Sequence, residues 1–281
     1  MVYEHEIPSG SRLYFGKSAQ IKRDIESKCA NILENKGFSE ISIPLFSYHQ
    51  QESFNDSKVL IRINDSANHE VSLRADSTVD VVRIVTKRLN RSHETKKWFY
   101  IQPIFTYPTK EQNQVGAEVI GGTLDEVANI ALELLKNLNL NATFQVANIA
   151  IAHILVENYG FELDDIKNIR LEKILNSKYE WIKDLVELDK IEDLKDLSIY
   201  PEDIKLELEK IANISNKIDS KNIIISPLYY APMRYYNSLV FRVFNSNELY
   251  LTGGIYTIKS INGAGFALNI DAIISNKIQR D

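Results

Sequence analysis

The sequence predicts an α+β fold in which a mainly antiparallel sheet is flanked by helices and carries a helical insertion. Strand patterns occur between residues 38 and 122 and return from residue 221 onward. Between them, residues 148–220 are mostly helical in pattern, rich in charge and poor in glycine. Because strands lie on both sides of this helical block, we expect one sheet built from both parts of the chain, with the block packed beside it.

Length and composition indicate one globular domain. The chain has 281 residues, of which 44% are hydrophobic and 25% are charged, and these proportions are ordinary for a soluble protein. We expect residues 1–281 to form a single domain with residues 148–220 inserted in it. The sequence shows no secretory signal pattern and no apolar run that could span a membrane, and its single cysteine, Cys29, excludes a disulfide framework. These features predict a cytoplasmic protein with no membrane partner.

The ionisable residues give no sign of a nucleic-acid surface or a metal site. The net charge is -5, whereas proteins that hold tRNA usually carry a broad basic footprint. A local basic run at helical spacing, which is usually a solvated face, consists of Arg83, Lys87, Arg88, Arg91, Lys96 and Lys97. The histidines, which show no metal-ligand spacing, are His5, His49, His69, His93 and His153. We therefore expect no tRNA, metal or cofactor to bind.

The first part of the chain alternates between helix and strand patterns. Residues 12–36 carry apolar side chains at three- and four-residue intervals and end before Gly37, which predicts a helix with a glycine C-cap. Residues 38–46 alternate between apolar and polar, which predicts a strand that ends in a proline. Residues 58–63 and 69–74 predict a hairpin around a polar turn.

Two more helices are predicted before the helical block. The first begins at Asp76 or Ser77, either of which can cap it. Asp80 has the spacing of a capping-box partner, and the buried stripe consists of Val79, Val82, Val85 and Leu89. Residues 124–138 predict a second, amphipathic helix.

Residues 98–122 are the most informative stretch and predict two strands joined by a polar loop. On the second strand, Gln114, Gly116 and Glu118 alternate with apolar residues, so these three share one face. A glycine within a strand often marks the close approach of a ligand or another backbone. We therefore expect an amide and a carboxylate with a gap between them, which form a slot for a small cationic or hydrogen-bonding molecule.

The same stretch resembles motif 2 of the class II aminoacyl-tRNA synthetases, and most closely that of the histidyl enzymes. The matching residues are Tyr100-Ile101, Pro103-Ile104-Phe105 and Gln114 to Val119. Residues 12–36 with 38–46 are similar to motif 1, which builds the dimer interface in that family, so the resemblance implies a homodimer. Residues 73–78 resemble the segment in which the family contacts the substrate α-amino group, at the positions of Asp76 and Thr78. A helix cap alone would explain these two residues equally well.

The C-terminal part resembles the remaining motifs of the histidyl enzymes. The residues that match the histidine-specific signature are Tyr235, Tyr236, Val240 and Phe241. Residues 251–256 resemble a glycine-rich strand of the family, and residues 263–273 resemble motif 3, where a strand enters a helix. The resemblance covers nearly the whole chain and implies a class II synthetase core. The chain ends at Asp281, so we expect no anticodon-binding domain.

Three arginines of the family are replaced. The positions that hold ATP in motifs 2 and 3 are Thr106 and Ala272, and the signature arginine falls on Ala231. Amino-acid activation needs fixed cations to stabilise the developing negative charge, and the loss of one such group typically raises the barrier by about 2.7–4 kcal/mol. Lys110 and Arg234 are nearby cations, but neither is an evident replacement. We therefore expect no catalysis of amino-acid activation.

A synthetase-like core without these groups is similar to the family of ATP phosphoribosyltransferase regulatory subunits. The resemblance implies a partner of the short-form ATP phosphoribosyltransferase catalytic subunit in histidine biosynthesis, with histidine as a possible effector. The histidine-binding residues that it implies are Asp76, Thr78, Gln114, Glu118, Tyr235 and Tyr236. Two alternatives remain open: an enzyme that activates an amino acid for a non-tRNA acceptor, and a scaffold that uses the dimer surface and binds no ligand.

Overall fold

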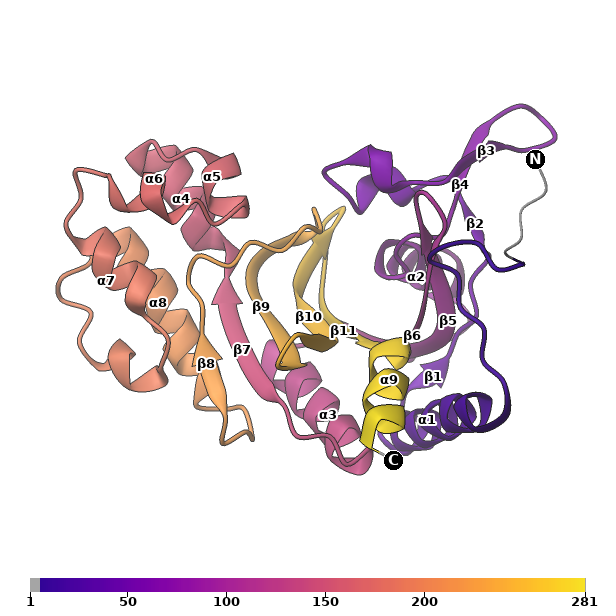
Figure 1. The fold of residues 1–281 in the computed structure, drawn as a ribbon. Helices are drawn as coiled ribbons and strands as arrows, with labels where there is room; N and C mark the ends of the chain where they lie inside the picture. Colours follow the sequence, from indigo (N-terminus) through magenta and orange to yellow (C-terminus); the bar gives the residue numbers. More distant parts are fainter. Residues whose placement is uncertain (1–5, 281) are drawn as a thin grey trace.

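The computed structural model describes residues 6–280 and is built around one eight-stranded sheet (Figure 1). In spatial order its strands are β1 (Ser39–Glu40), β5 (Lys97–Thr106), β6 (Lys110–Ile120), β11 (Ile261–Asn269), β10 (Glu248–Ile258), β9 (Tyr236–Asn245), β7 (Thr143–Asn148) and β8 (Ile223–Ile225). Neighbouring strands are antiparallel except in the two outer pairs, β1 with β5 and β7 with β8, which are parallel. The predicted α+β fold with a mainly antiparallel sheet is confirmed.

Helices cover one face of this sheet and form the main core with it (Figure 1). These helices are α1 (Gly16–Asn35), α3 (Leu124–Asn137) and α9 (Ile270–Arg280). Their apolar side chains pack against Val115, Ala117 and Val119 of β6, which are almost inaccessible to solvent. Cys29 of α1 is fully buried, and burial raises the pKa of its thiol to about 12. The thiol is therefore an inert core group at neutral pH.

A helical lobe lies beside the sheet, on the left in Figure 1, and connects β7 to β8. It consists of α4 (Ile149–Tyr159), α5 (Leu163–Lys167), α6 (Leu171–Leu175), α7 (Trp181–Glu187), the 3₁₀ helix η4 (Ile191–Lys195) and α8 (Glu202–Ser215). Parallel neighbouring strands need a long crossover connection, and this lobe provides it. The lobe has its own aromatic packing, in which the ring centroids of Tyr159 and Trp181 are 5.1 Å apart.

A smaller sheet with the order β2-β4-β3 lies on the opposite side of the molecule. Its strands are β2 (Phe46–Ser47), β4 (Glu70–Leu73) and β3 (Arg62–Asn64), and the short helices beside it are η1 (Gln50–Glu52) and η2 (Ser57–Val59). The predicted hairpin is confirmed as β3 and β4, although its first strand starts later because residues 57–59 form η2. After β4 the chain enters α2 (Thr78–Ile84), which continues as the π-helix η3 (Val85–Leu89).

The single strand predicted for residues 38–46 is wrong. Strand β1 is only two residues long, and the next strand, β2, belongs to the other sheet. Pro44 has no N–H to donate to a sheet, and the N–H of Ile43 donates to the side-chain oxygen of Gln102 at 3.4 Å. The carbonyls of Ile43 and Pro44 accept from the guanidinium of Arg74 at 2.8 and 3.0 Å. Side chains therefore take the place of a strand partner here.

The start of α2 follows one of the two predicted capping arrangements. The carboxylate of Asp76 accepts a hydrogen bond from the N–H of Val79 at 3.3 Å, so Asp76 caps the helix. The predicted capping box is wrong, because the Asp80 carboxylate accepts from the side chains of Ser47 and Gln50 at 2.9 and 2.7 Å instead. These bonds tie the first turn of α2 to the segment that follows β2.

Candidate functional site

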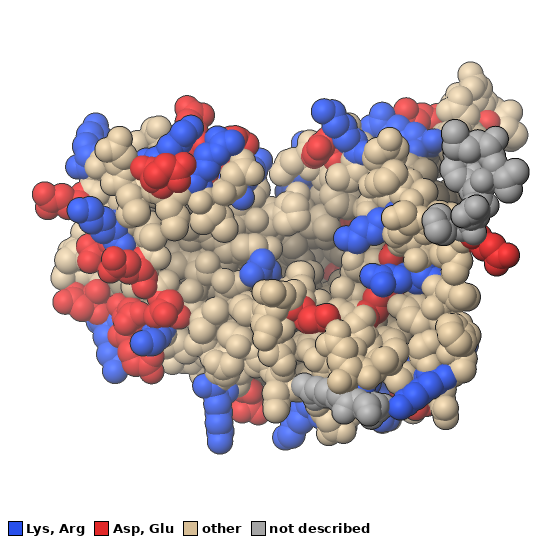
Figure 2. Space-filling model, viewed as in Figure 1, with Lys and Arg blue, Asp and Glu red and all other residues tan. Residues whose placement is uncertain are grey.

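A cavity of about 260 Å³ lies over the sheet face that α1, α3 and α9 leave uncovered. Its walls come from the start of α2, from β6, β10 and β11, and from the segment that leads into β9. Five of the six predicted histidine-binding residues line it, namely Asp76, Thr78, Gln114, Tyr235 and Tyr236. Figure 2 shows that the surface is hollowed between the helical lobe and the rest of the molecule. The fold thus gathers residues from three distant parts of the chain.

The alternation predicted for β6 is confirmed by its pairing with β11. Gln114, Gly116 and Glu118 pair with Asn269, Ala267 and Gly265, respectively. Paired residues on neighbouring strands point to the same face of a sheet. Asn269 and Ala267 both line the cavity, so Gln114, Gly116 and Glu118 face the cavity side of the sheet. The apolar residues that alternate with them on β6 face the core.

The gap expected at Gly116 is not open to a ligand, and this part of the prediction is wrong. A Cβ at this position would lie 2.1 Å from Cζ of Tyr100, which pairs with Gly116 across β5 and β6. The Tyr100 ring therefore fills the space that the glycine leaves, and its hydroxyl donates to the Glu118 carboxylate at 3.4 Å. The glycine accommodates an aromatic ring of the same chain.

Glu118 lies beneath the cavity rather than on its wall. Its side chain is only 1% exposed, and Oε1 accepts from the Thr78 hydroxyl at 2.8 Å. Oε2 lacks a partner of good hydrogen-bond geometry, although the neighbouring Tyr256 hydroxyl interacts with the carboxylate electrostatically. Burial is the main cause that raises the pKa of Glu118 well above its ordinary value, and the nearby Asp76 carboxylate raises it further. The Glu118 carboxyl therefore favours its protonated, neutral form.

Asp76 is a second buried carboxyl, and it faces the cavity. Oδ1 accepts from the Tyr235 hydroxyl and Oδ2 from the Ser53 hydroxyl, each at 3.0 Å. Burial raises the pKa of Asp76 as well. Among the residues of 6–280 that line the cavity there is no lysine or arginine, so two buried carboxyls share this site without a cation from the wall. Because an opposite charge nearby favours the ionised form of a buried carboxyl, the site suits a ligand that brings a positive charge.

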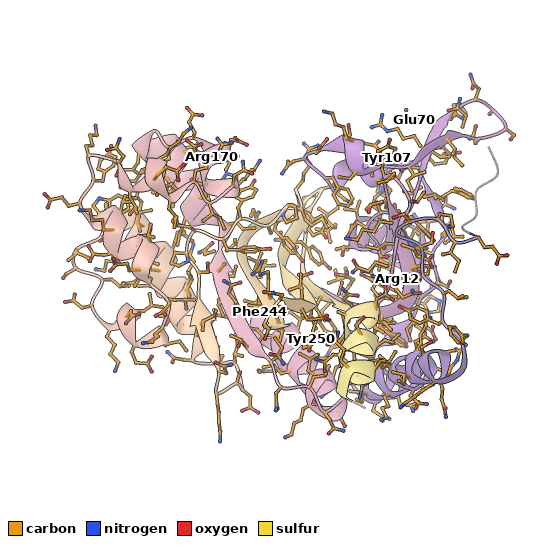
Figure 3. The ribbon with its side chains drawn as sticks, in the orientation of Figure 1. Arg12, Glu70, Tyr107, Arg170, Phe244 and Tyr250 are labelled. Atoms are coloured by element: carbon orange, nitrogen blue, oxygen red, sulfur yellow. The ribbon has the colours of Figure 1, made fainter. Side chains whose placement is uncertain are left out.

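The cations considered as replacements for the missing arginines lie elsewhere. Lys110 lines a neighbouring cavity of about 250 Å³, together with Ala272 and with Arg12 of the segment before α1 (Figure 3). Arg12 was not apparent from the sequence, because no motif marks it. Ala231, the position of the signature arginine, lines the 260 Å³ cavity. Arg234 does not line it, and its side chain donates to a backbone carbonyl at 3.4 Å. Lys110 and Arg12 thus lie near Ala272, the motif 3 position, but neither of them nor Arg234 lines the 260 Å³ cavity.

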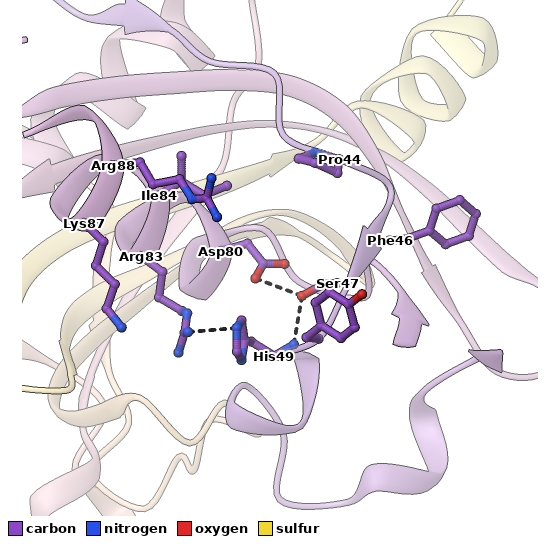
Figure 4. A pocket seen from close by; sticks show the side chains of 10 residues that line it. Pro44, Phe46, Ser47, His49, Asp80, Arg83, Ile84, Lys87 and Arg88 are labelled. Atoms are coloured by element: carbon purple, nitrogen blue, oxygen red, sulfur yellow. Dashed lines mark hydrogen bonds between the residues drawn. The ribbon is translucent and has the colours of Figure 1, made fainter. Parts of the chain in front are cut away.

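A third cavity, of about 500 Å³, lies between β2 and α2 and is lined partly by the predicted basic run (Figure 4). Lys87 and Arg88 are exposed, in agreement with a solvated helix face. Arg83 differs, because it is only partly exposed and donates to the Glu52 carboxylate at 3.1 Å. Phe46 lies on the other side of this cavity and is 54% exposed. The cavity therefore combines basic and exposed apolar side chains.

The described residues show neither a metal centre nor a membrane span. Within residues 6–280, no group of three or more His, Cys, Asp or Glu side chains could hold a metal ion. His5, one of the histidines considered above, lies outside this range. No helix in the same range combines the length and the apolar character that crossing a bilayer requires.

Comparisons with known proteins agree with this architecture. The family model described as histidyl-tRNA synthetase matches residues 14–273. The chain is 40% identical to an ATP phosphoribosyltransferase regulatory subunit from Wolinella succinogenes, over 100% of this chain and 99% of that protein. It is 37% identical to one from Helicobacter hepaticus, over 98% of each. A crystal structure from Bacillus halodurans, described as an ATP phosphoribosyltransferase regulatory subunit/histidyl-tRNA synthetase, matches with a TM-score of 0.85 at 18% identity, over 98% of this chain and 83% of that one.

Proposed function

The chain belongs to the histidyl-tRNA synthetase-like family of ATP phosphoribosyltransferase regulatory subunits, and we propose that it activates a short-form ATP phosphoribosyltransferase catalytic subunit in histidine biosynthesis. One observation carries this proposal. The cavity keeps Asp76, Thr78 and Gln114 on its wall, but none of its described lining residues is a lysine or an arginine. Such a site is suited to sensing an amino acid rather than to activating it.

The chemistry of activation explains why the missing cations matter. When an aminoacyl adenylate forms, negative charge develops on the phosphate and on its leaving group. Fixed cations stabilise that charge in the transition state. Thr106 and Ala272 cannot supply a charge, and no lysine or arginine of the described residues lines the 260 Å³ cavity. This favours a non-catalytic subunit over the alternative of an enzyme that activates an amino acid for a non-tRNA acceptor.

Reconstitution tests the proposed function. The chain is mixed with the short-form catalytic subunit of the same organism, and formation of phosphoribosyl-ATP is measured with and without histidine. We expect the catalytic subunit to be nearly inactive alone, active in the mixture and inhibited by histidine, with a coupling between the two sites of about 1–3 kcal/mol. Failure to associate in size-exclusion chromatography, or full activity of the catalytic subunit alone, would reject the proposal. Histidine-dependent pyrophosphate exchange above background would favour the enzyme instead.

We further propose that the amino acid sensed in the cavity is histidine. Its ammonium group would pair with Asp76, and its ring would pack against Tyr235 or Tyr236, all of which line the cavity. Glu118 would act through the Thr78 hydroxyl that it holds, since it lies beneath the wall. A cationic ligand would supply the counter-charge that these carboxyls lack. Titration calorimetry with L-histidine tests this, and the absence of binding at millimolar concentration would reject it.

We also propose that the chain forms a homodimer through residues 38–46 and their neighbours. Leu45, Phe46 and Tyr48 are 45%, 54% and 52% exposed, and contiguous exposed apolar side chains mark interaction surfaces. Phe46→Asp would place a charge in this interface without disturbing a buried group. We expect light scattering at micromolar concentration to give a dimer for the wild type and a monomer for Phe46→Asp.

The control for this prediction is Ile199→Asp in the helical lobe, because Ile199 is also 54% exposed. This variant adds the same charge to an apolar position of equal exposure and should leave the mass unchanged. A wild type that is a monomer, or a Phe46→Asp variant with the mass of the wild-type dimer, would place the interface elsewhere.

A further inference from the structure

Arg242, on β9, carries a charge that no described carboxylate balances. Its side chain is partly buried. Within residues 6–280, its polar and aromatic side-chain contacts are one hydrogen bond to an amide and two aromatic rings. A charge that is partly removed from water is expensive unless it is paired. An anion from outside the described chain could therefore pair with this arginine.

The contacts of Arg242 fix its guanidinium and leave its outer edge free. Nε donates to Oε1 of Gln145 on β7 at 2.9 Å. Cζ lies 4.3 Å from the ring centroid of Tyr229 and 5.6 Å from that of Phe244, which follows on the same face of β9 (Figure 3). Because Nε is the inner nitrogen, Nη1 and Nη2 remain available as the two-pronged donor that a carboxylate accepts.

The strand register puts Arg242 on the sheet face of the 260 Å³ cavity, and its contact with Tyr229 puts the guanidinium beside the cavity wall. Arg242 pairs with Thr252 of β10, which pairs in turn with Ala267 of β11, so all three share one sheet face. Thr252 and Ala267 line the cavity, and so does Tyr229, against which Arg242 stacks.

We propose that Arg242 binds the carboxylate of the amino acid held in this cavity, while Asp76 takes its ammonium group. The inference rests on the proposed sensing function and adds the residue that recognises the acidic end of the ligand. The cavity has carboxyls on one side and a guanidinium at its rim, a polarity that matches a zwitterionic amino acid. Arg242 does not occupy a position of the family arginines discussed above, which fall on Thr106, Ala231 and Ala272.

A purely structural role for Arg242 would give a different result in binding experiments. If Arg242 only packed against Tyr229 and Phe244, its loss would weaken the fold but would not make binding depend on the carboxylate of the ligand. The test therefore changes both the protein and the ligand. L-Histidinamide has the size, ring and ammonium group of L-histidine but lacks the carboxylate.

Calorimetric titrations of L-histidine and L-histidinamide are made at about pH 6, below the ordinary α-amino pKa of about 7.7. We expect the wild type to bind L-histidine roughly 10- to 100-fold more tightly than L-histidinamide, since a hydrogen-bonded charge pair is lost. Arg242→Gln should bind both ligands as the wild type binds L-histidinamide, and Arg242→Lys should fall between. Arg234→Gln is the matched control, because Arg234 lies outside the cavity wall, and it should keep the wild-type preference.

Three outcomes would overturn the inference: equal affinity of the wild type for the two ligands, an unchanged preference in Arg242→Gln, or no binding of L-histidine to the wild type at millimolar concentration. The comparison of two ligands on the wild type needs no variant, so misfolding of Arg242→Gln cannot hide the answer. The reconstitution assay separates this inference from the proposed function. Activation of the catalytic subunit without a carboxylate preference would leave the regulatory role standing and reject the role of Arg242.

Discussion

Arg74→Met should lower the free energy of unfolding by about 3 kcal/mol or more. Arg74 is 1% exposed and donates four hydrogen bonds to the backbone carbonyls of Ile43, Pro44 and Pro103, at 2.7 to 3.1 Å. Methionine keeps an unbranched stem but is shorter and donates nothing, and each buried carbonyl left unpaired costs about 1–3 kcal/mol. Removal of a buried charge offsets part of this loss. Urea unfolding measures the change, which is large beside a typical total of about 5–15 kcal/mol.

The matched control is Arg62→Met in β3. The side chain of Arg62 is 42% exposed and only 3.7 Å from the Glu70 carboxylate, and an exposed pair of this kind contributes less than about 1 kcal/mol. Hydrogen exchange gives a second readout, because Arg74 holds the carbonyls of Ile43 and Pro44 within residues 41–45. We expect faster exchange there in Arg74→Met and unchanged exchange in β10. Equal stability of the two variants would show that the carbonyls find other donors.

The sequence predicts the elements that repeat with a regular period and misses those that depend on a distant partner. Alternation in residues 98–122 predicts β5 and β6 and the shared face of Gln114 and Glu118, because a strand imposes a period of two. The residues before Val79 indicate a helix start, and Asp76 indeed caps it. Such signals are local, so neighbouring residues contain all the information that they need.

The remaining features depend on contacts between separate segments. In the sequence, Gly116 is equally compatible with a gap for a ligand and with space for an aromatic ring. Only the register with β5 shows that the Tyr100 ring fills this space. Alternation over residues 38–46 predicts a strand, but Arg74 and Gln102 capture its backbone groups from other elements. Arg242 directly follows Phe241 of the histidine-specific signature, but it is not one of the matching residues, and its place on the cavity face of the sheet follows from the pairing of β9 with β10.

Glu118→Gln should stabilise the protein increasingly as the pH rises. The pKa of Glu118 is well above its ordinary value of 4.5, chiefly because the carboxyl is buried. Between pH 4.5 and this raised pKa the group is therefore neutral in the folded state and ionised in the unfolded state. Its contribution to stability is fully present below the unfolded pKa and is lost as the pH rises through the folded pKa. Glutamine stays neutral, so the free energy of unfolding of the variant does not fall in this way. In the wild type the fall amounts to about 1.4 kcal/mol per pH unit.

Urea unfolding of wild type and variant at several pH values between 5 and 8 measures the difference. Glutamine also keeps a side-chain oxygen for the Thr78 hydroxyl and gains an N–H that can donate to Tyr256, whose hydroxyl lacks a partner of good geometry. Glu157→Gln, on the exposed face of α4, is the control and should show a difference that does not change with pH. A flat difference for Glu118→Gln would mean that Glu118 is ionised in the folded protein. In that case a cation must reach it from the cavity side, since no lysine or arginine of the described chain lines that wall.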